Sequence, residues 1–252
     1  MQDKLSDDLL ENYMHNFWGY GNLSADYWFI GMEEGGVQNF EELIERVNTW
    51  VKLGQLTVQD IQDSHRAIGA GDYFGRQKGR PKYQPTWERL IRIILSCKHH
   101  GATSFGIDEI RNYQATALGR KDAETCLMEI LPLPAKGAKH WIYKDKTGIP
   151  YLSDRSSYSK ELFPLRVERL RDMISEKRPK SVVCYGGGKG YYPKWCEVAG
   201  KTLKLKQFMG QQVAFDHVKG VTFALVPHPN SRGLTNEFLN NFGSELARRV
   251  KT

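Results

Sequence analysis

Four short apolar runs, each rich in β-branched or aromatic residues, stand out along the chain and end at a turn, a glycine or a proline. They cover residues 27–31, 126–131, 181–185 and 221–226. Runs of this length without polar alternation are typical of strands that are buried on both faces of a parallel sheet. Helical spacing of apolar residues covers 40–53, 86–96, 162–176 and 236–250. This alternation predicts an α/β fold, a three-layer α/β/α sandwich around a short, mainly parallel four-stranded sheet.

The carboxyl ends of parallel strands share one edge of the sheet, and ligands bind in the crevice beyond it. The residues that follow the four expected strands should therefore meet there. They are Glu33, Glu34, Glu129, Gly186, Gly187, Gly188, His228, Asn230 and Arg232. The irregular segment 54–85 is expected to be an insertion over this crevice, within a single domain that covers residues 1–252.

Composition narrows the classes of function. The chain has 36 lysines and arginines against 29 acidic residues, a formal charge of +7 that favours a polyanionic partner such as nucleic acid. It contains neither a long apolar span nor a signal-peptide pattern, so we expect a cytoplasmic protein without a membrane partner. The four cysteines form no C-x-x-C pair, which predicts buried thiols and neither a metal site nor a cofactor.

Two motifs lie at expected strand ends, "GMEEGG" at 31–36 and "HPNSR" at 228–232. Pro227 and Pro229 flank His228 and stiffen the backbone around it. In this order, the motifs resemble the two signature motifs of the uracil-DNA glycosylase superfamily. The segments "PTWERLIRII" at 85–94 and "LMEILPLP" at 127–134 resemble further parts of that family, so the resemblance covers most of the chain. It implies a monomeric, cofactor-free enzyme that acts on DNA without a protein partner.

The resemblance also implies roles for the acids and the histidine. Glu33 stands where the family keeps its catalytic aspartate or asparagine, and a carboxylate there would stabilise the positive sugar and hold the attacking water. His228 would donate a hydrogen bond to O2 of the departing base. Glu34 stands where the family usually has proline; it either shares the water or, as we favour, caps a helix start. Which of the two glutamates carries the chemistry stays open.

Two positions bear on the choice of base. Glu129 aligns with an asparagine that recognises uracil in the family, and an ionised carboxylate would instead accept a hydrogen bond from the N4 amine of cytosine. Alternatively, Glu129 forms a structural pair with an arginine. Gly35 stands where a tyrosine blocks C5 of the pyrimidine in uracil-specific enzymes. Together the two positions predict a C5-modified cytosine, such as the hydroxymethyl or glucosylated base of some phage genomes, and hence antiviral defence.

Aromatic and loop residues complete the expected site. Phe40, Tyr73 and Phe74 are candidates to stack on a flipped base, although such aromatics are more often part of a core. Base flipping needs a side chain that fills the gap in the duplex, and Arg232 or Leu234 would be this wedge. The further DNA-contact candidates are Asn230, Ser231, Gly187 and Lys189, with two basic stretches at 75–82 and 201–206.

Alternatives from other classes remain. One is a repair glycosylase for uracil or another deaminated base, and a second is a relative that binds DNA without cleaving it. A third is a hydrolase of small N-glycosides. No lysine is placed to act as a Schiff-base nucleophile, so we expect a monofunctional enzyme that leaves an abasic site.

Overall fold

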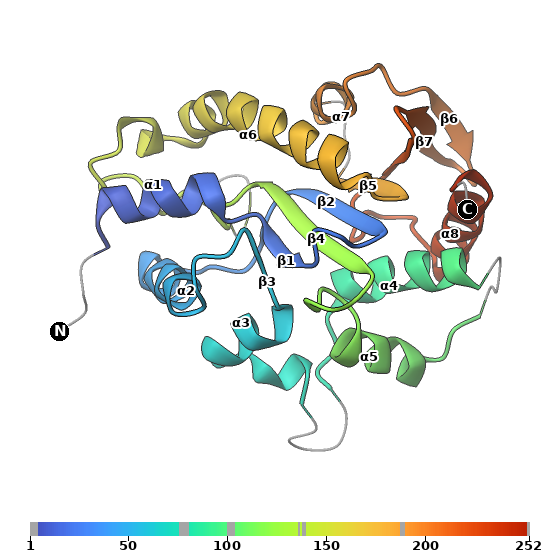
Figure 1. The fold of residues 1–252 in the computed structure, drawn as a ribbon, viewed down its shortest axis with the longest axis horizontal. Helices are drawn as coiled ribbons and strands as arrows, with labels where there is room; N and C mark the ends of the chain where they lie inside the picture. Colours follow the sequence, from blue (N-terminus) through green and yellow to red (C-terminus); the bar gives the residue numbers. More distant parts are fainter. Residues whose placement is uncertain are drawn as a thin grey trace.

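A computed structural model describes residues 5–75, 81–99, 104–135, 137, 140–186 and 190–250. Its centre is one eight-stranded sheet in the order β3-β1-β4-β2-β5-β8-β7-β6 (Figure 1). The strands are β1 Gly19–Gly21, β2 Tyr27–Glu33, β3 Val58–Gln59, β4 Thr125–Leu131, β5 Ser181–Tyr185, β6 Leu205–Phe208, β7 Gln211–Val218 and β8 Val221–Val226.

The four expected strands form the middle of this sheet. Strands β4, β2, β5 and β8 are neighbours, and each pairs in parallel with the next. The α/β class is therefore confirmed, but the expected four-stranded sheet is wrong, because the sheet is twice as large and partly antiparallel. Strand β1 pairs antiparallel with β4, and β7 pairs antiparallel with both β6 and β8.

The missed strands lie toward the sheet edges, where no continuous apolar run is needed. Strands β1 and β3 have only three and two residues, and β6 exposes alternate residues to solvent. Two-residue turns join β6 to β7 and β7 to β8. Both turns have positive φ at both positions, at Met209 and Gly210 and at Lys219 and Gly220, as type I′ hairpin turns require.

Helices stand near all four expected positions. They are α2 Phe40–Lys52, α4 Pro85–Lys98, α6 Arg155–Lys177 and α8 Asn236–Arg249. Helix α6 begins before the expected residue 162, because Asp154 caps it by accepting a hydrogen bond from the backbone N–H of Ser157 at 2.9 Å. Four helices were not expected: α1 Asp7–Asn16, α3 Ile61–Ala67, α5 Ile107–Thr116 and α7 Tyr192–Ala199.

Segment 54–85 is less irregular than its sequence suggests. It contains β3, α3 and the short 3-10 helix Gly71–Tyr73; a second 3-10 helix covers Pro150–Ser153. Asp60 caps α3 by accepting hydrogen bonds from the N–H groups of Gln62 and Asp63. The expectation of an irregular insertion is therefore wrong. Helix α3 has only seven residues, which is too short to show a clear helical pattern of apolar residues in the sequence.

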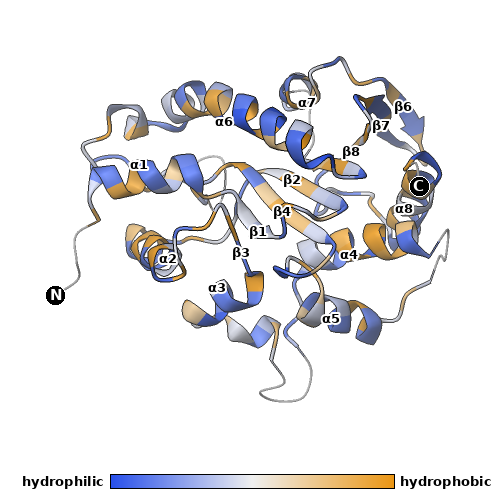
Figure 2. Ribbon diagram, viewed as in Figure 1, coloured by the Kyte–Doolittle hydropathy of each residue, from blue (hydrophilic) through white to orange (hydrophobic). Residues whose placement is uncertain are grey.

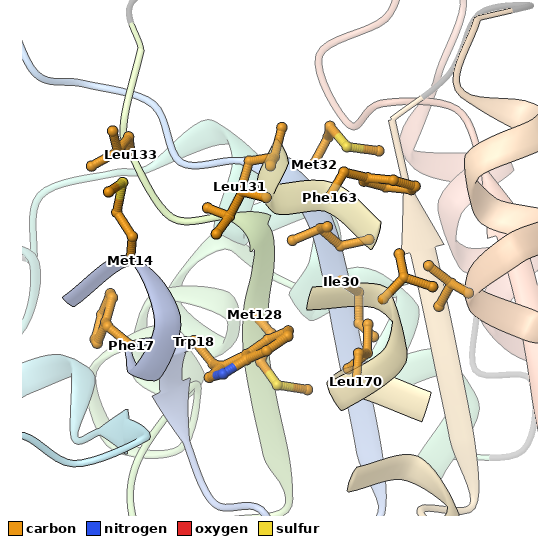
Figure 3. Packing of buried hydrophobic residues seen from close by; sticks show 14 of the residues in the cluster. Met14, Phe17, Trp18, Ile30, Met32, Met128, Leu131, Leu133, Phe163 and Leu170 are labelled. Atoms are coloured by element: carbon orange, nitrogen blue, oxygen red, sulfur yellow. The ribbon is translucent and has the colours of Figure 1, made fainter. Parts of the chain in front are cut away.

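Helices cover both faces of the sheet, as Figure 1 shows. On one face, Trp28 and Ile30 of β2 pack with α1, α2, α6 and α7, and part of this cluster is drawn in Figure 3. On the other face, Phe29 of the same strand packs with α4, α5 and α8. Figure 2 shows the matching pattern in the helices, with hydrophobic stretches on α4 and alternating hydrophilic and hydrophobic residues along α6. The alternation along β2 thus divides the core between two sides.

A buried arginine joins α6 to the start of the sheet. Arg166 is 1% exposed, and its guanidinium lies 3.6 Å from the ring centroid of Trp18. It donates hydrogen bonds to four backbone carbonyls, those of Met14, Phe17, Glu129 and Ile130. Burial lowers the pKa of Arg166 to about 9, so the group stays charged at neutral pH. These hydrogen bonds offset the cost of burying the charge, and they also fix the backbone at Glu129.

The structure bears on the expectations about the cysteines and about membrane-spanning segments. Cys97, Cys126 and Cys184 are buried free thiols, as expected, whereas Cys196 is half-buried. Across the described ranges, we find no helix with the length and apolar character needed to cross a membrane.

Candidate functional site

A cavity of about 660 Å³ opens beyond the carboxyl ends of β2, β4, β5 and β8. Six of the residues predicted from the strand ends and motifs line it: Glu33, Glu34, Gly35, Glu129, His228 and Asn230. The prediction of a shared neighbourhood is confirmed for these residues, whereas Gly186 and Arg232 do not line the cavity, and Gly187 and Gly188 lie outside the described residues. Segment 54–85 contributes His65, Ile68, Ala70, Tyr73 and Gln84 to the same lining, so its expected place at the crevice is also confirmed.

Glu33 ends β2 and forms an ion pair with Arg155, the first residue of α6. Arg155 also donates hydrogen bonds to the carbonyls of Gly137 at 3.0 Å and His140 at 3.3 Å, and its guanidinium lies 5.5 Å from the ring centroid of Trp141. Burial raises the pKa of Glu33, while Arg155 acts in the opposite direction. The arginine therefore favours the ionised carboxylate that a catalytic role requires.

Glu34 has a different cationic partner. Arg46 of α2 lies 2.6 Å from its Oε1, and the Tyr20 hydroxyl donates to the same oxygen at 3.3 Å. The interpretation that Glu34 caps a helix is wrong, because α2 begins at Phe40 and its cap is Asn39. The two adjacent glutamates are thus held by arginines from two separate helices.

Glu129 lies in β4, and its carboxyl group is held by a hydroxyl instead of a cation. The Tyr185 hydroxyl donates to Oε1 at 2.7 Å, whereas Oε2 is buried without a hydrogen-bond partner among the described residues. Burial, opposed by this hydrogen bond and reinforced by the charges of Glu34 and Glu33, raises the pKa of Glu129 to about 8. Burial and the neighbouring acids thus favour the protonated form over the ionised carboxylate that was expected from the sequence. The alternative of a structural pair with an arginine is not found in the described part of the chain.

His228 lies at the cavity rim in a defined tautomer. The backbone N–H of Asn230 donates to Nδ1 at 3.1 Å, so the neutral ring carries its proton on Nε2. The Asn230 side chain in turn donates to Thr86 Oγ1 at 3.0 Å. Withdrawal of the ring from water, and then the charge of Arg89, lower the pKa of His228. The imidazole is therefore a neutral hydrogen-bond donor at physiological pH.

Aromatic side chains form one wall of the cavity. The ring centroids of His65 and Trp87 are 5.2 Å apart, and those of Tyr73 and Trp87 are 5.4 Å apart. Of the three stacking candidates, only Tyr73 lines the cavity. Phe40 and Phe74 are 8% and 6% exposed and belong to the two cores, so a stacking role is wrong for both in this conformation.

Sequence reasoning did not single out several lining or supporting residues. They are Tyr20, Arg46, His65, Trp87, Arg155 and Tyr185. Trp87 lies within a segment that carried the family resemblance, and Tyr185 ends an expected strand, so both had a usable signal. The two arginines had none, because no motif or strand-end position marked them.

The expected DNA contacts have mixed outcomes. Arg232 is exposed, and Ser231 is half-buried and donates its backbone N–H to the carbonyl of His228 at 2.7 Å. Leu234 is 8% exposed and packs into the core beneath α8, so it is wrong as a wedge in this conformation. Gly187 and Lys189 lie outside the described residues.

The basic stretches at 75–82 and 201–206 are described to different extents. Most of the first, residues 76–80, lies outside the described part of the chain. In the second, Lys201 pairs with Asp216 and Lys206 pairs with Glu245. These two lysines are therefore partly neutralised by neighbouring acids.

Among the described residues, no group of three or more histidine, cysteine, aspartate or glutamate side chains is arranged to hold a metal ion. No protein-family model matches the chain. A search of curated proteins gives no match. No solved structure matches either.

Proposed function

We propose that this chain is a monofunctional DNA glycosylase that flips out a C5-modified cytosine, hydrolyses its N-glycosidic bond and leaves an abasic site. The favoured substrate is hydroxymethylcytosine or its glucosylated form in phage DNA. The observation that carries the proposal is the meeting of Glu33, His228 and Glu129 in one cavity, although they come from three distant parts of the sequence. These are the residues to which the family resemblance assigns the acid, the donor and the base contact.

The chemistry follows from the charge that develops during cleavage. As the bond between C1′ and the base breaks, its electron pair leaves with the base and the sugar becomes positive. The Glu33 carboxylate stabilises the sugar cation and accepts a proton from the water whose oxygen attaches to C1′. The Nε2–H of His228 donates to O2 of the departing base and stabilises its negative charge.

Room at the cavity supports a substituted base. A Cβ atom added at Gly35 would meet no heavy atom within 4 Å, so this side of the cavity is open. A volume of about 660 Å³ lies in the range of sites for ligands much larger than a pyrimidine ring. The aromatic wall formed by Tyr73 and Trp87 offers apolar surface to such a base or its substituent.

Uracil is the second candidate substrate, because a protonated Glu129 can both donate and accept hydrogen bonds. Its raised pKa removes the repulsion that an ionised carboxylate would exert on uracil O4. Repair of uracil-containing DNA therefore stays a separate outcome of the test.

The test is an abasic-site assay on duplexes that contain uracil, cytosine, hydroxymethylcytosine or glucosylated hydroxymethylcytosine. We expect cleavage at the modified cytosines. Glu33→Gln and His228→Ala should each lose at least about 100-fold in rate while keeping DNA affinity, in line with the loss of one transition-state contact. Release of uracil alone would favour the repair function. Full-rate cleavage by Glu33→Gln, or no cleavage of any duplex, would contradict the proposed mechanism or function.

A further inference from the structure

Three glutamates line the cavity, but only two form ion pairs with cations in the parts of the chain that the structure describes. The pairs are Glu33 with Arg155 and Glu34 with Arg46. Glu129 has only the Tyr185 hydroxyl at Oε1, and its Oε2 is buried without a partner in the described ranges. An unpaired buried carboxylate is strongly disfavoured, whereas a protonated carboxyl group avoids most of the cost of burying a charge. The contacts alone therefore favour the neutral acid.

Charged and titratable groups from several elements surround Glu129. They are Glu33 from β2, Glu34 just beyond it, Tyr185 from β5, His228 beyond β8, Arg46 from α2, Tyr20 from β1, His65 from α3 and Arg166 from α6. The two neighbouring acids disfavour a third negative charge, and the Tyr185 hydrogen bond opposes them only in part. Arg46 is bound to Glu34, and Arg166 contacts only the backbone carbonyl at Glu129.

We propose that Glu129 meets the flipped base as a neutral carboxylic acid, whose hydroxyl donates one hydrogen bond while its carbonyl oxygen accepts another. This inference rests on the proposed function. Cytosine presents an acceptor at ring N3 beside a donor at N4, and a neutral acid is complementary to this pair. An ionised carboxylate has no proton to donate and would direct a lone pair at N3.

The backbone beneath the acid is adapted to this placement. A Cβ atom on Gly31 would lie 2.2 Å from Oε2 and 2.6 Å from Oε1 of Glu129. Only glycine at position 31 lets the carboxyl group rest against β2, next to the hydroxyl that Tyr185 supplies. The carboxyl group therefore rests against β2 at the cavity wall.

The first experiment follows the proton without any DNA. The full chain, labelled with ¹³C in its glutamate carboxyl groups, is titrated by NMR, and the Glu129 signal is assigned by its absence in Glu129→Gln. We expect a titration midpoint near 8, the value to which the environment raises the pKa. Tyr185→Phe should move the midpoint higher, because the hydroxyl stabilises the ionised form. A wild-type midpoint of 7 or above supports the inference, and one below 7 overturns it.

The second experiment measures excision of the modified cytosine under single-turnover conditions. An amide donates and accepts as the neutral acid does, so Glu129→Gln keeps its donor at every pH. A group with a pKa of about 8 is about 90% neutral at pH 7 and about 10% neutral at pH 9. The ratio of the wild-type rate to the Glu129→Gln rate should thus fall about tenfold from pH 7 to pH 9. A fall of threefold or more supports the inference, and a smaller change overturns it. If the wild type cleaves no duplex, the proposed function fails, and the NMR midpoint alone decides this inference.

Discussion

At the scale of single residues, the protonation of each acid in the cavity depends on the side chains around it. Glu33 and Glu34 are adjacent in sequence, yet each has its own arginine, and Glu129 has a hydroxyl instead. The sequence predicted correctly that these acids lie together, because the carboxyl ends of parallel strands share one edge of the sheet. The protonation of these acids could not be predicted from the sequence, because the pKa of Glu129 depends on burial that only the tertiary structure creates.

Gly35 tests the size of the base site. In Gly35→Tyr, the new side chain enters open space from a backbone without positive φ, so the fold should tolerate it. We expect the ring to occupy the side of the cavity assigned to the C5 substituent and to lower cleavage of the glucosylated base at least about 100-fold, the scale of a lost near-attack geometry. Gly35→Ala is the matched control and should change the rate by less than about threefold. Equal rates for Gly35→Tyr and wild type on the glucosylated duplex would show that the substituent lies elsewhere.

Arg155 controls the acid side of the pH–rate profile. Glu33 must be ionised to act, so activity should fall as the pH decreases through its raised pKa. Arg155→Met removes the charge that lowers this pKa, and the acid limb should therefore move to higher pH. Arg155→Lys keeps the charge and should shift the limb less. An acid limb that stays in place in Arg155→Met would mean that another group titrates there.

At the scale of elements, sequence reasoning succeeded where a strand is buried on both faces. Strands β2, β4, β5 and β8 carry continuous apolar runs, and all four were found. The edge strand β6 and the short β1 have no such run, because their pairing depends on neighbouring strands. The same limit hid α3, whose seven residues are fixed by its cap and by contacts to the rest of the chain.

Two glycines at element contacts should respond differently to alanine. At Gly243, a Cβ would lie 2.3 Å from the backbone carbonyl of Ile93, so α8 would have to move away from α4, with a loss of about 1–3 kcal/mol in unfolding free energy. At Gly31, the Cβ would meet only the end of the Glu129 side chain, which can rotate away. Thermal unfolding should therefore show a large loss for Gly243→Ala and a small one for Gly31→Ala, while only the latter changes base preference. The reverse order of stabilities would contradict these packing arguments.

At the scale of the whole molecule, Glu129 makes stability depend on pH. Between its unfolded pKa near 4.5 and its folded pKa of about 8, the folded chain binds a proton that the unfolded chain has lost. Stability therefore falls as the pH rises through this window. Glu129→Gln removes this term, so its melting temperature relative to wild type should increase by at least about 3 °C from pH 5 to pH 8. Calorimetry at both pH values checks this, and a difference that does not change with pH would refute the buried proton.

The two arginine pairs at the end of β2 have a consequence for motion. Arg155 belongs to the first turn of α6, whereas Arg46 belongs to the middle of α2. A displacement of the α6 start would release Glu33 and leave Glu34 bound, and a displacement of α2 would do the opposite. The two neighbouring carboxylates are thus tied to separate helices, so a shift of either helix alone would free only one negative charge in the cavity.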